Sequence, residues 1–146
     1  MKKVYLIGSL RNPEVPLVGN QLRSLGLDVF DDWWGAGDEA DEKWQAYEQI
    51  RGRKYKDAIY GRAAENIFNF DLTHLNSSDF GVLMLPSGKS GHLELGYLIG
   101  QGKPSYVLFD RLFDEDRTRW DVMYRFATKV CFNVDDLIDE IRGLMW

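Results

Sequence analysis

The chain has 146 residues, of which 45% are hydrophobic and 28% charged, as is typical of a single globular domain, here residues 1–146. The formal net charge of -5 argues against nucleic acid or an anionic membrane as a partner, because both attract basic surfaces. A lone cysteine excludes an internal disulfide, and one Cys with two His cannot form a thiolate zinc site. The sequence contains neither a signal-peptide pattern nor a membrane span, so we expect a cytoplasmic protein.

Apolar runs and helical spacing alternate along the chain and predict an α/β fold. In chain order we predict strand 3–7, helix 13–25, strand 27–30, helix 41–55, helix 58–75, strand 79–85, helix 93–100, strand 105–109, helix 120–126, strand 129–132 and helix 134–144. Gly26 is a natural C-cap for the first helix, Gly61 is expected to break the third, and Asn133 is expected to cap the last.

Strands that are separated by helices predict a parallel sheet covered on both faces. The runs 82–85 and 106–109 are apolar without alternation, as expected for central strands. We therefore predict a small flavodoxin-like three-layer α/β/α domain with a five-stranded parallel sheet. Such folds bind ligands beyond the carboxyl ends of their strands, which points to segments 8–11, 31–37 and 86–94 as parts of a site.

The segment that follows the first predicted strand is Gly8-Ser9-Leu10-Arg11. Backbone amides at a Gly–Ser turn and the forked guanidinium of Arg11 would suit a phosphate group. The segment lacks both the ending of a Walker A motif and the G-x-G-x-x-G fingerprint. An ordinary polar turn is an equally good interpretation.

A Gly/Ser-rich turn joins the third predicted strand to the next helix. Ser87, Ser90 and Gly91 lie in this turn, whose amides could hold a polar ligand. Glu94 falls just inside the predicted helix, where it either complements the helix dipole or takes part in chemistry. We interpret His92 as an ordinary residue of the turn.

Two further residues could bring polar groups to the same place. Tyr5 shares a face of its strand with Lys3 and Ile7, and it is either a core tyrosine or one that orients a carboxylate in the site. Asp71 lies late in an apolar-faced helix, where aspartate is unfavourable. It is either a surface carboxylate or a second carboxylate aimed at the end of the third strand. We interpret His74 as a surface residue rather than as a base.

Adjacent indoles, Trp33 and Trp34, follow the second predicted strand. Two exposed indoles in a loop are energetically unfavourable. They either plug the edge of the core or form a flat wall for an aromatic ligand such as a nucleobase.

Three motifs occur in order along the chain. They are Tyr5-Leu-Ile-Gly-Ser9, Phe70-Asp-Leu-Thr-His-Leu-Asn-Ser-Ser-Asp79, and Gly91-His-Leu-Glu-Leu-Gly-Tyr97 followed by Gly102-Lys-Pro104. Together they resemble the nucleoside 2-deoxyribosyltransferase superfamily, which includes nucleoside deoxyribosyltransferases and 2'-deoxynucleoside 5'-monophosphate N-glycosidases. The similarity covers roughly residues 3–109.

The resemblance implies that Glu94 is a nucleophile at the anomeric carbon, that Asp71 acts on the base as general acid, and that Tyr5 holds Glu94 in line. It implies no metal or organic cofactor, and a homodimer or higher homo-oligomer, since neighbouring subunits complete the sites in that family. The family's polar turn residue corresponds to Ser87 or Ser90. Asp121 matches a position near the C-terminus that, in that family, contacts the 5' end of a neighbouring subunit's substrate.

The expected activity is cleavage or transfer at the N-glycosidic bond of a (deoxy)nucleoside or its 5'-monophosphate. The alternative is a catalytically inactive nucleotide-binding or sensing module. Arg11 favours a 5'-phosphate and Asp121 a 5'-hydroxyl, so both substrate classes stay open, as do hydrolysis and transfer. Segment 38–61 is longer than the family usually has, and we expect it to form a lid or a dimer surface.

Overall fold

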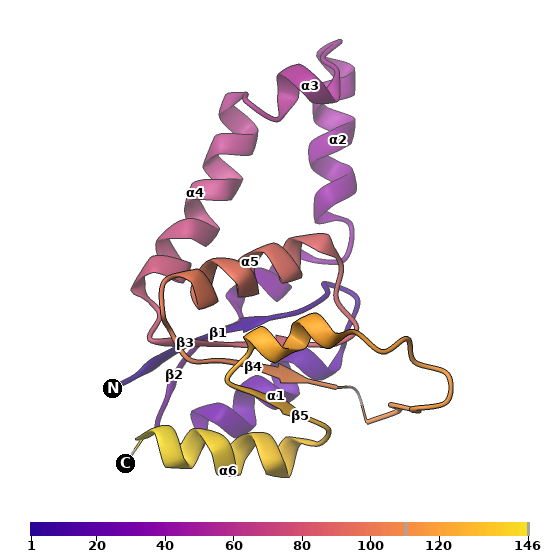
Figure 1. The fold of residues 1–146 in the computed structure, drawn as a ribbon. Coiled ribbons are helices and arrows are strands. Elements are labelled where there is room, and N and C mark those ends of the chain that lie inside the picture. Colours follow the sequence, from indigo (N-terminus) through magenta and orange to yellow (C-terminus); the bar gives the residue numbers. More distant parts are fainter. Residues whose placement is uncertain (110, 146) are drawn as a thin grey trace.

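The computed structural model describes residues 1–109 and 111–145. Its elements in chain order are β1 (Lys3–Ile7), α1 (Glu14–Arg23), β2 (Asp28–Phe30), a 3-10 helix (Asp32–Ala36), α2 (Ala40–Ile50), α3 (Tyr55–Ala58), α4 (Arg62–Ser77), β3 (Phe80–Met84), α5 (Lys89–Gly100), β4 (Ser105–Leu108), a second 3-10 helix (Val122–Phe126), β5 (Lys129–Cys131) and α6 (Val134–Met145). All strand pairs are parallel, in the order β2-β1-β3-β4-β5 (Figure 1). This order confirms the predicted flavodoxin-like sheet.

Two apolar layers cover the two faces of this sheet. On one face, Val4 and Leu6 of β1 pack in a core with α1 and α6. On the other, Tyr5 and Ile7 pack with Leu75 of α4 and with residues of α5. Figure 1 shows α1 and α6 on one side of the sheet and α5 on the other. The alternation predicted for the first strand is therefore confirmed, and it turns Tyr5 towards α4 and α5.

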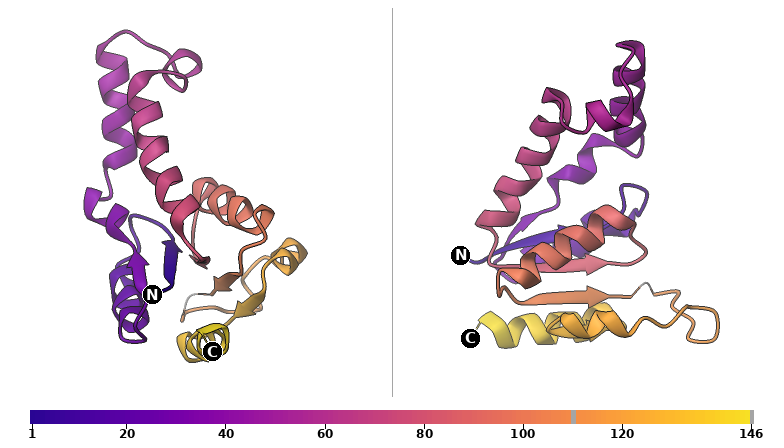
Figure 2. Two further views of the ribbon diagram at one scale, coloured as in Figure 1. Left: turned by 90° about the vertical axis from the view of Figure 1, so that its left-hand side faces the viewer. Right: turned by 45° about the horizontal axis from the view of Figure 1, so that its top comes forward.

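Helices α2, α3 and α4 form an arm that projects away from the sheet (Figures 1 and 2). The arm has a small interior of its own, where Trp44 of α2 packs edge-on against Tyr55 with ring centroids 6.4 Å apart. The buried carboxylate of Glu48 pairs there with Arg51 at 3.0 Å and lies 3.9 Å from Arg53. Segment 38–61, for which a lid or a dimer surface was expected, supplies the outer half of this arm.

Several predicted helix boundaries were wrong. Helix α2 ends at Ile50 instead of reaching Tyr55, because Gly52 adopts a φ of 74°, which ends a helix. The break at Gly61 is confirmed, since this residue precedes α4. A Cβ added to Gly61 would lie 2.7 Å from Arg53 Nη2 and 3.1 Å from the Ala58 carbonyl oxygen, so a larger residue there would displace the Arg53 side chain.

The start of α5 also differs from the prediction. The helix begins at Lys89 rather than at residue 93, so Ser90 and Gly91 belong to its first turn and Glu94 to its second. His92 is accordingly a helical residue and not part of the turn. Among the described residues, no helix is long and apolar enough to span a membrane.

Candidate active site

A short hydrogen bond joins β1 to α5. The buried Tyr5 hydroxyl donates to Glu94 Oε2 at 2.5 Å, and the Glu94 side chain is only partly accessible. The strand alternation directs Tyr5 towards this face, and a position one turn into α5 directs Glu94 back over the sheet. Of the two roles considered for Tyr5, orientation of a carboxylate therefore matches its geometry.

Asp71 on α4 lies beside this pair. It is partly buried, and its carboxyl interacts with the Tyr5 hydroxyl and electrostatically with Glu94. Three elements, β1, α4 and α5, thus bring one hydroxyl and two carboxyl groups together. Of the two placements considered for Asp71, the one towards the sheet is observed.

Burial changes the protonation of these groups. Desolvation raises the pKa of Glu94 to about 7, the hydrogen bond from Tyr5 opposes this rise, and the charge of Asp71 adds to it. The pKa of Asp71 is also raised, first by burial, and the nearby carboxylate of Asp41 contributes. The pKa of Tyr5 is raised by burial and by Glu94, so this residue stays a hydrogen-bond donor. Both carboxyl groups therefore hold a proton more readily than exposed carboxyl groups do.

The turn before α5 packs tightly on the end of the sheet. A Cβ added to Gly91 would collide with Ser87 Oγ and would lie 3.1 Å from Ile7 Cγ2 and 3.2 Å from Leu83 Cδ1. Ser87 is partly buried against the first turn of the helix, whereas Ser90 is exposed. Among the described residues, no side chain caps the N-terminus of α5, so its amides face the region where a polar ligand was predicted.

The loop after β1 holds its own polar contacts. Gly8 lies close to Val15 of α1, and Ser9 Oγ accepts a hydrogen bond from the Arg11 amide at 3.1 Å. The Arg11 guanidinium pairs with Glu42 of α2 at 3.0 Å. Sequence reasoning did not include Glu42 or Asp41 among the site residues, because their proximity depends on how the arm returns to the sheet.

The two indoles are anchored to the backbone. Trp33 Nε1 donates to the Leu6 carbonyl at 2.7 Å and Trp34 Nε1 to the Asn12 carbonyl at 3.0 Å. Both side chains are partly buried and pack against the core, with Trp33 touching both apolar layers. These contacts agree with a plug at the edge of the core, and a wall for a nucleobase stays a prediction.

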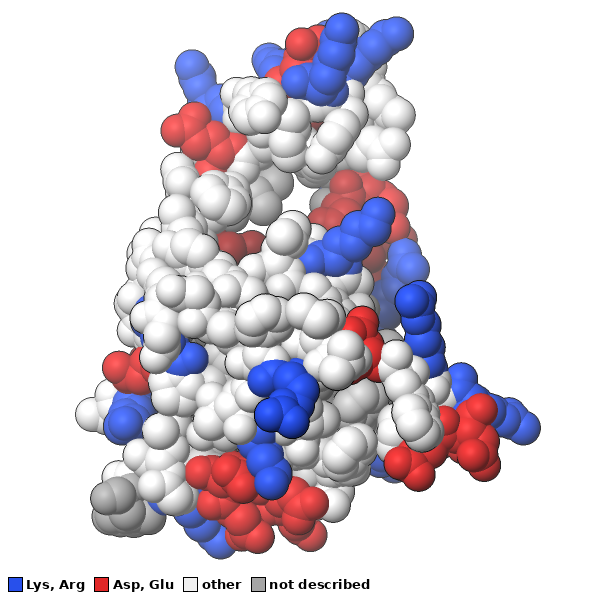
Figure 3. All heavy atoms as spheres, viewed as in Figure 1, with Lys and Arg blue, Asp and Glu red and all other residues white. Residues whose placement is uncertain are grey.

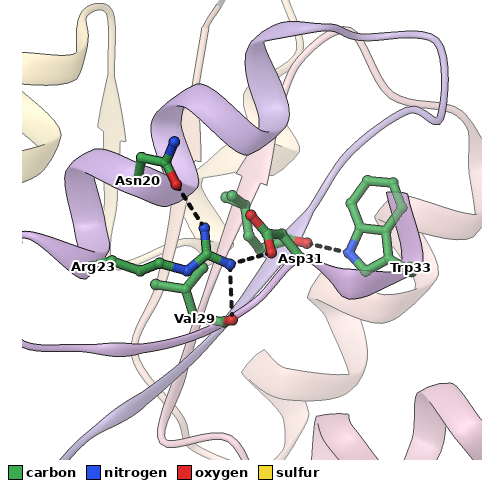
Figure 4. Close-up of polar contacts among 6 residues, drawn as sticks. Asn20, Arg23, Val29, Asp31 and Trp33 are labelled. Carbon is green, nitrogen blue, oxygen red and sulfur yellow. Dashed lines mark hydrogen bonds and ion pairs between the residues drawn. The ribbon is translucent and has the colours of Figure 1, made fainter. Parts of the chain in front are cut away.

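A polar network holds the end of β2 just before Trp33 (Figure 4). The buried Asp31 carboxylate forms an ion pair with Arg23 of α1, and Arg23 also donates to Asn20 Oδ1 at 3.1 Å and to the Val29 carbonyl at 3.4 Å. Asp31 begins segment 31–37, which was predicted to be part of a site, and the structure pairs it with Arg23 instead. Arg23, its partner on the preceding helix, lies eight residues earlier, and this spacing does not by itself predict an ion pair.

The remaining candidates lie at the edges of this region. Asp121 is exposed, and its Oδ1 accepts a hydrogen bond from the Met123 amide at 2.9 Å, capping the second 3-10 helix. Tyr124 of that helix contacts His92 Nε2 at 2.9 Å, which ties the helix to the start of α5. His74, expected at the surface, is partly buried and stacks on Phe30.

A pocket of about 620 Å³ lies between the loop after β1 and the start of α2. It is lined by Arg11, Asp38, Glu39, Glu42, Lys43 and Ala46. Tyr5, Asp71 and Glu94 do not line it. Asp41, next to Glu42, acts electrostatically on Asp71 and so links the pocket to the three grouped residues.

The arrangement defines a flavodoxin-like α/β domain with paired carboxyl groups at the sheet, and solved structures share the fold. The Clostridium botulinum CMP N-glycosidase BcmB is 10% identical with a TM-score of 0.52, and the match covers 97% of this chain and 99% of that one. A 2-deoxyribosyltransferase from Bacillus psychrosaccharolyticus is 20% identical with a TM-score of 0.56, and the match covers 92% of this chain and 89% of that one. Both structures share the fold of this chain, which confirms the fold that the resemblance implied. No protein-family model and no curated protein sequence matches the chain.

Proposed function

We propose that this protein is an enzyme that cleaves or transfers at the N-glycosidic bond of a nucleoside or its 5'-monophosphate. The observation that carries the proposal is the hydrogen bond from Tyr5 to Glu94 with Asp71 beside it. The fold neighbours, a CMP N-glycosidase and a 2-deoxyribosyltransferase, support the same class of reaction.

The proposed mechanism has two steps. Glu94 attacks the anomeric carbon, the bond from that carbon to the base nitrogen breaks, and the electron pair leaves with the base. The raised pKa of Asp71 suits it to give the departing base its proton. Water or a second base then attacks the glycosyl–Glu94 ester, gives its proton to the ionised Asp71, and releases the Glu94 carboxylate. Tyr5 holds Glu94 in position throughout, and the scheme requires no metal or organic cofactor.

The substrate would lie across the three strand ends that the sequence singles out. In this proposal Gly8, Ser9 and Arg11 approach one end of the substrate, and Ser87, Ser90 and Gly91 approach the sugar beside Glu94. Trp33 and Trp34 border the base of the substrate. Asp121 of a neighbouring subunit contacts the 5' end of the substrate. Three contacts support this arrangement: Trp33 donates to the carbonyl of Leu6 in β1, Gly91 lies close to Ile7 of β1, and Tyr124, on the 3-10 helix that Asp121 caps, contacts His92 of α5.

We also propose that the chain forms a homodimer or a higher homo-oligomer. The support is a set of large apolar side chains that are exposed on α4 and α5, namely Ile67, Phe68, Phe70, Leu93 and Tyr97. Figure 3 shows few charged side chains over these two helices, while Lys and Arg gather at the tip of the arm. Exposed apolar patches of this kind commonly mark protein interfaces.

A chromatographic screen for released base tests the proposal. The protein is incubated with a panel of nucleosides and 5'-monophosphates, each with and without a second free base, beside Glu94→Gln as an isosteric control. Release that needs no acceptor and is lost in the control identifies a hydrolase. Product that forms only with an acceptor identifies a transferase. Tight binding without any base release would contradict the proposal and favour a nucleotide-sensing module.

A further inference from the structure

The Arg11 guanidinium is already paired with a carboxylate. Arg11 follows β1 in the loop that the sequence marks as a possible phosphate site, yet its Nη2 donates to Glu42 Oε1 at 3.0 Å. A guanidinium that holds a carboxylate offers less of its donor fork and less net charge to a phosphate.

The surroundings of this pair carry an excess of negative charge. Three carboxylates, Asp38, Glu39 and Glu42, line the pocket of about 620 Å³ against two cations, Arg11 and Lys43. A phosphate that entered this pocket would therefore meet more repulsion than attraction at close range.

The loop that carries Arg11 begins beside the helix that carries Glu94. A Cβ added to Gly91, in the first turn of α5, would lie 3.1 Å from Cγ2 of Ile7, the last residue of β1. Asp41, which precedes Glu42 in the first turn of α2, also acts electrostatically on Asp71. A substrate at Glu94 would therefore have the loop of Arg11 at one side.

We propose that Glu42 is a specificity-determining residue whose pairing with Arg11 makes the site prefer a nucleoside with a free 5'-hydroxyl over the same nucleoside with a 5'-phosphate. This inference rests on the function proposed above. The side chains of the pair are largely exposed, 71% for Arg11 and 56% for Glu42, so the pair adds little to stability, and its effect lies in neutralising the guanidinium.

The test compares kcat/KM for one nucleoside and its 5'-monophosphate. In the unmodified protein the nucleoside is the better substrate. Glu42→Gln frees the Arg11 guanidinium. The ratio of kcat/KM for the monophosphate to kcat/KM for the nucleoside should then rise at least about tenfold, which is equivalent to about 1.4 kcal/mol. The gain shrinks as salt is added, because exposed charges are screened.

Two controls isolate the cause. Glu65→Gln removes the same charge from an exposed position on α4 that does not line the pocket, and it should leave the ratio unchanged. The double variant Arg11→Gln with Glu42→Gln should lose the gain. The inference is overturned if the unmodified protein prefers the monophosphate, if Glu42→Gln behaves like Glu65→Gln, or if the double variant keeps the gain.

A binding measurement separates failure of this inference from failure of the proposed function. If no substrate releases its base, calorimetry with ribose 5-phosphate and ribose still decides the role of Glu42. Glu42→Gln should bind ribose 5-phosphate at least about tenfold more tightly than the unmodified protein, with ribose unchanged. Equal affinities of the two proteins for ribose 5-phosphate would overturn the inference.

Discussion

The imidazole of His74 lies flat on the ring of Phe30, with ring centroids 3.7 Å apart and planes inclined by 8°. Phe30 also packs against Tyr5, with centroids 5.0 Å apart. Lys3 Nζ lies 2.9 Å from His74 Nδ1 and 2.7 Å from Ser77 Oγ. These contacts hold the C-terminal half of α4 on the sheet, and Asp71 stands one turn before His74 on that helix.

His74→Ala should therefore lower the free energy of unfolding by about 1 kcal/mol, the size of an aromatic pair contact. Urea unfolding measures the change, and Phe68→Ala, which removes an exposed ring from the same helix, serves as a control. A loss no larger than that of Phe68→Ala would show that the stack does not anchor α4.

The same histidine should make stability depend on pH. Burial, followed by the charge of Lys3, lowers the pKa of His74, while Asp28 and Asp32 oppose the shift. A group whose pKa is lowered on folding contributes stability above its ordinary pKa of 6.5 and loses it as the pH falls. The free energy of unfolding of the unmodified protein should decline as the pH falls through this range, and that of His74→Ala should not. Parallel curves of unfolding free energy against pH for the two proteins would contradict this.

Glu94→Gln should stabilise the protein while abolishing turnover. The pKa of Glu94 rises from 4.5 to about 7 on folding. The contribution of Glu94 to stability is therefore complete below pH 4.5, and it is lost as the pH rises through 7 and the buried carboxyl ionises. At pH 8 the variant, which buries no charge, should be more stable by roughly 1–3 kcal/mol. Thermal unfolding at pH 8 and pH 4.5 checks the sign, because the difference should vanish at the lower pH.

Tyr5→Phe should shift the pH profile of activity. The hydrogen bond from Tyr5 lowers the pKa of Glu94, so its removal raises that pKa. The acidic limb of kcat/KM should move to higher pH, and the maximum should fall by about 10²-fold through loss of positioning. A reduced maximum with an unmoved limb would show that Tyr5 acts only through packing.

Two glycines of α5 should respond oppositely to alanine. Gly91→Ala forces Ser87 and the first turn away from Ile7 and Leu83, so it should lower both stability and activity. A Cβ at Gly96 would meet no heavy atom of the described residues within 4 Å, so Gly96→Ala should stabilise the helix by about 1 kcal/mol. Urea unfolding of both variants checks the contrast, and equal effects would mean that the packing at Gly91 is not specific.

Much of the fold could be predicted because β1, β3 and β4 are largely apolar and are followed by glycine or polar turns. The grouping of Tyr5, Asp71 and Glu94 was expected from the family resemblance, whereas the residues alone left two interpretations open for each, because strand alternation fixes only the face of Tyr5. The start of α5 could not be predicted, because Gly and Ser in its first turn are equally typical of a loop. The Arg11–Glu42 pair and the stack of His74 on Phe30 depend on the path of the arm, which local patterns do not encode.

The arm divides the proposed site between two structural units. Tyr5 and Glu94 belong to the sheet and the helix packed on it, whereas Asp71 and Glu42 belong to helices of the arm. If Glu94 is the nucleophile, as proposed, it can stay unchanged while substitutions in the arm alter which base and which 5' end are accepted. For engineering of the proposed activity, this separation makes α2 and α4 the helices to vary and the Tyr5–Glu94 pair the part to keep.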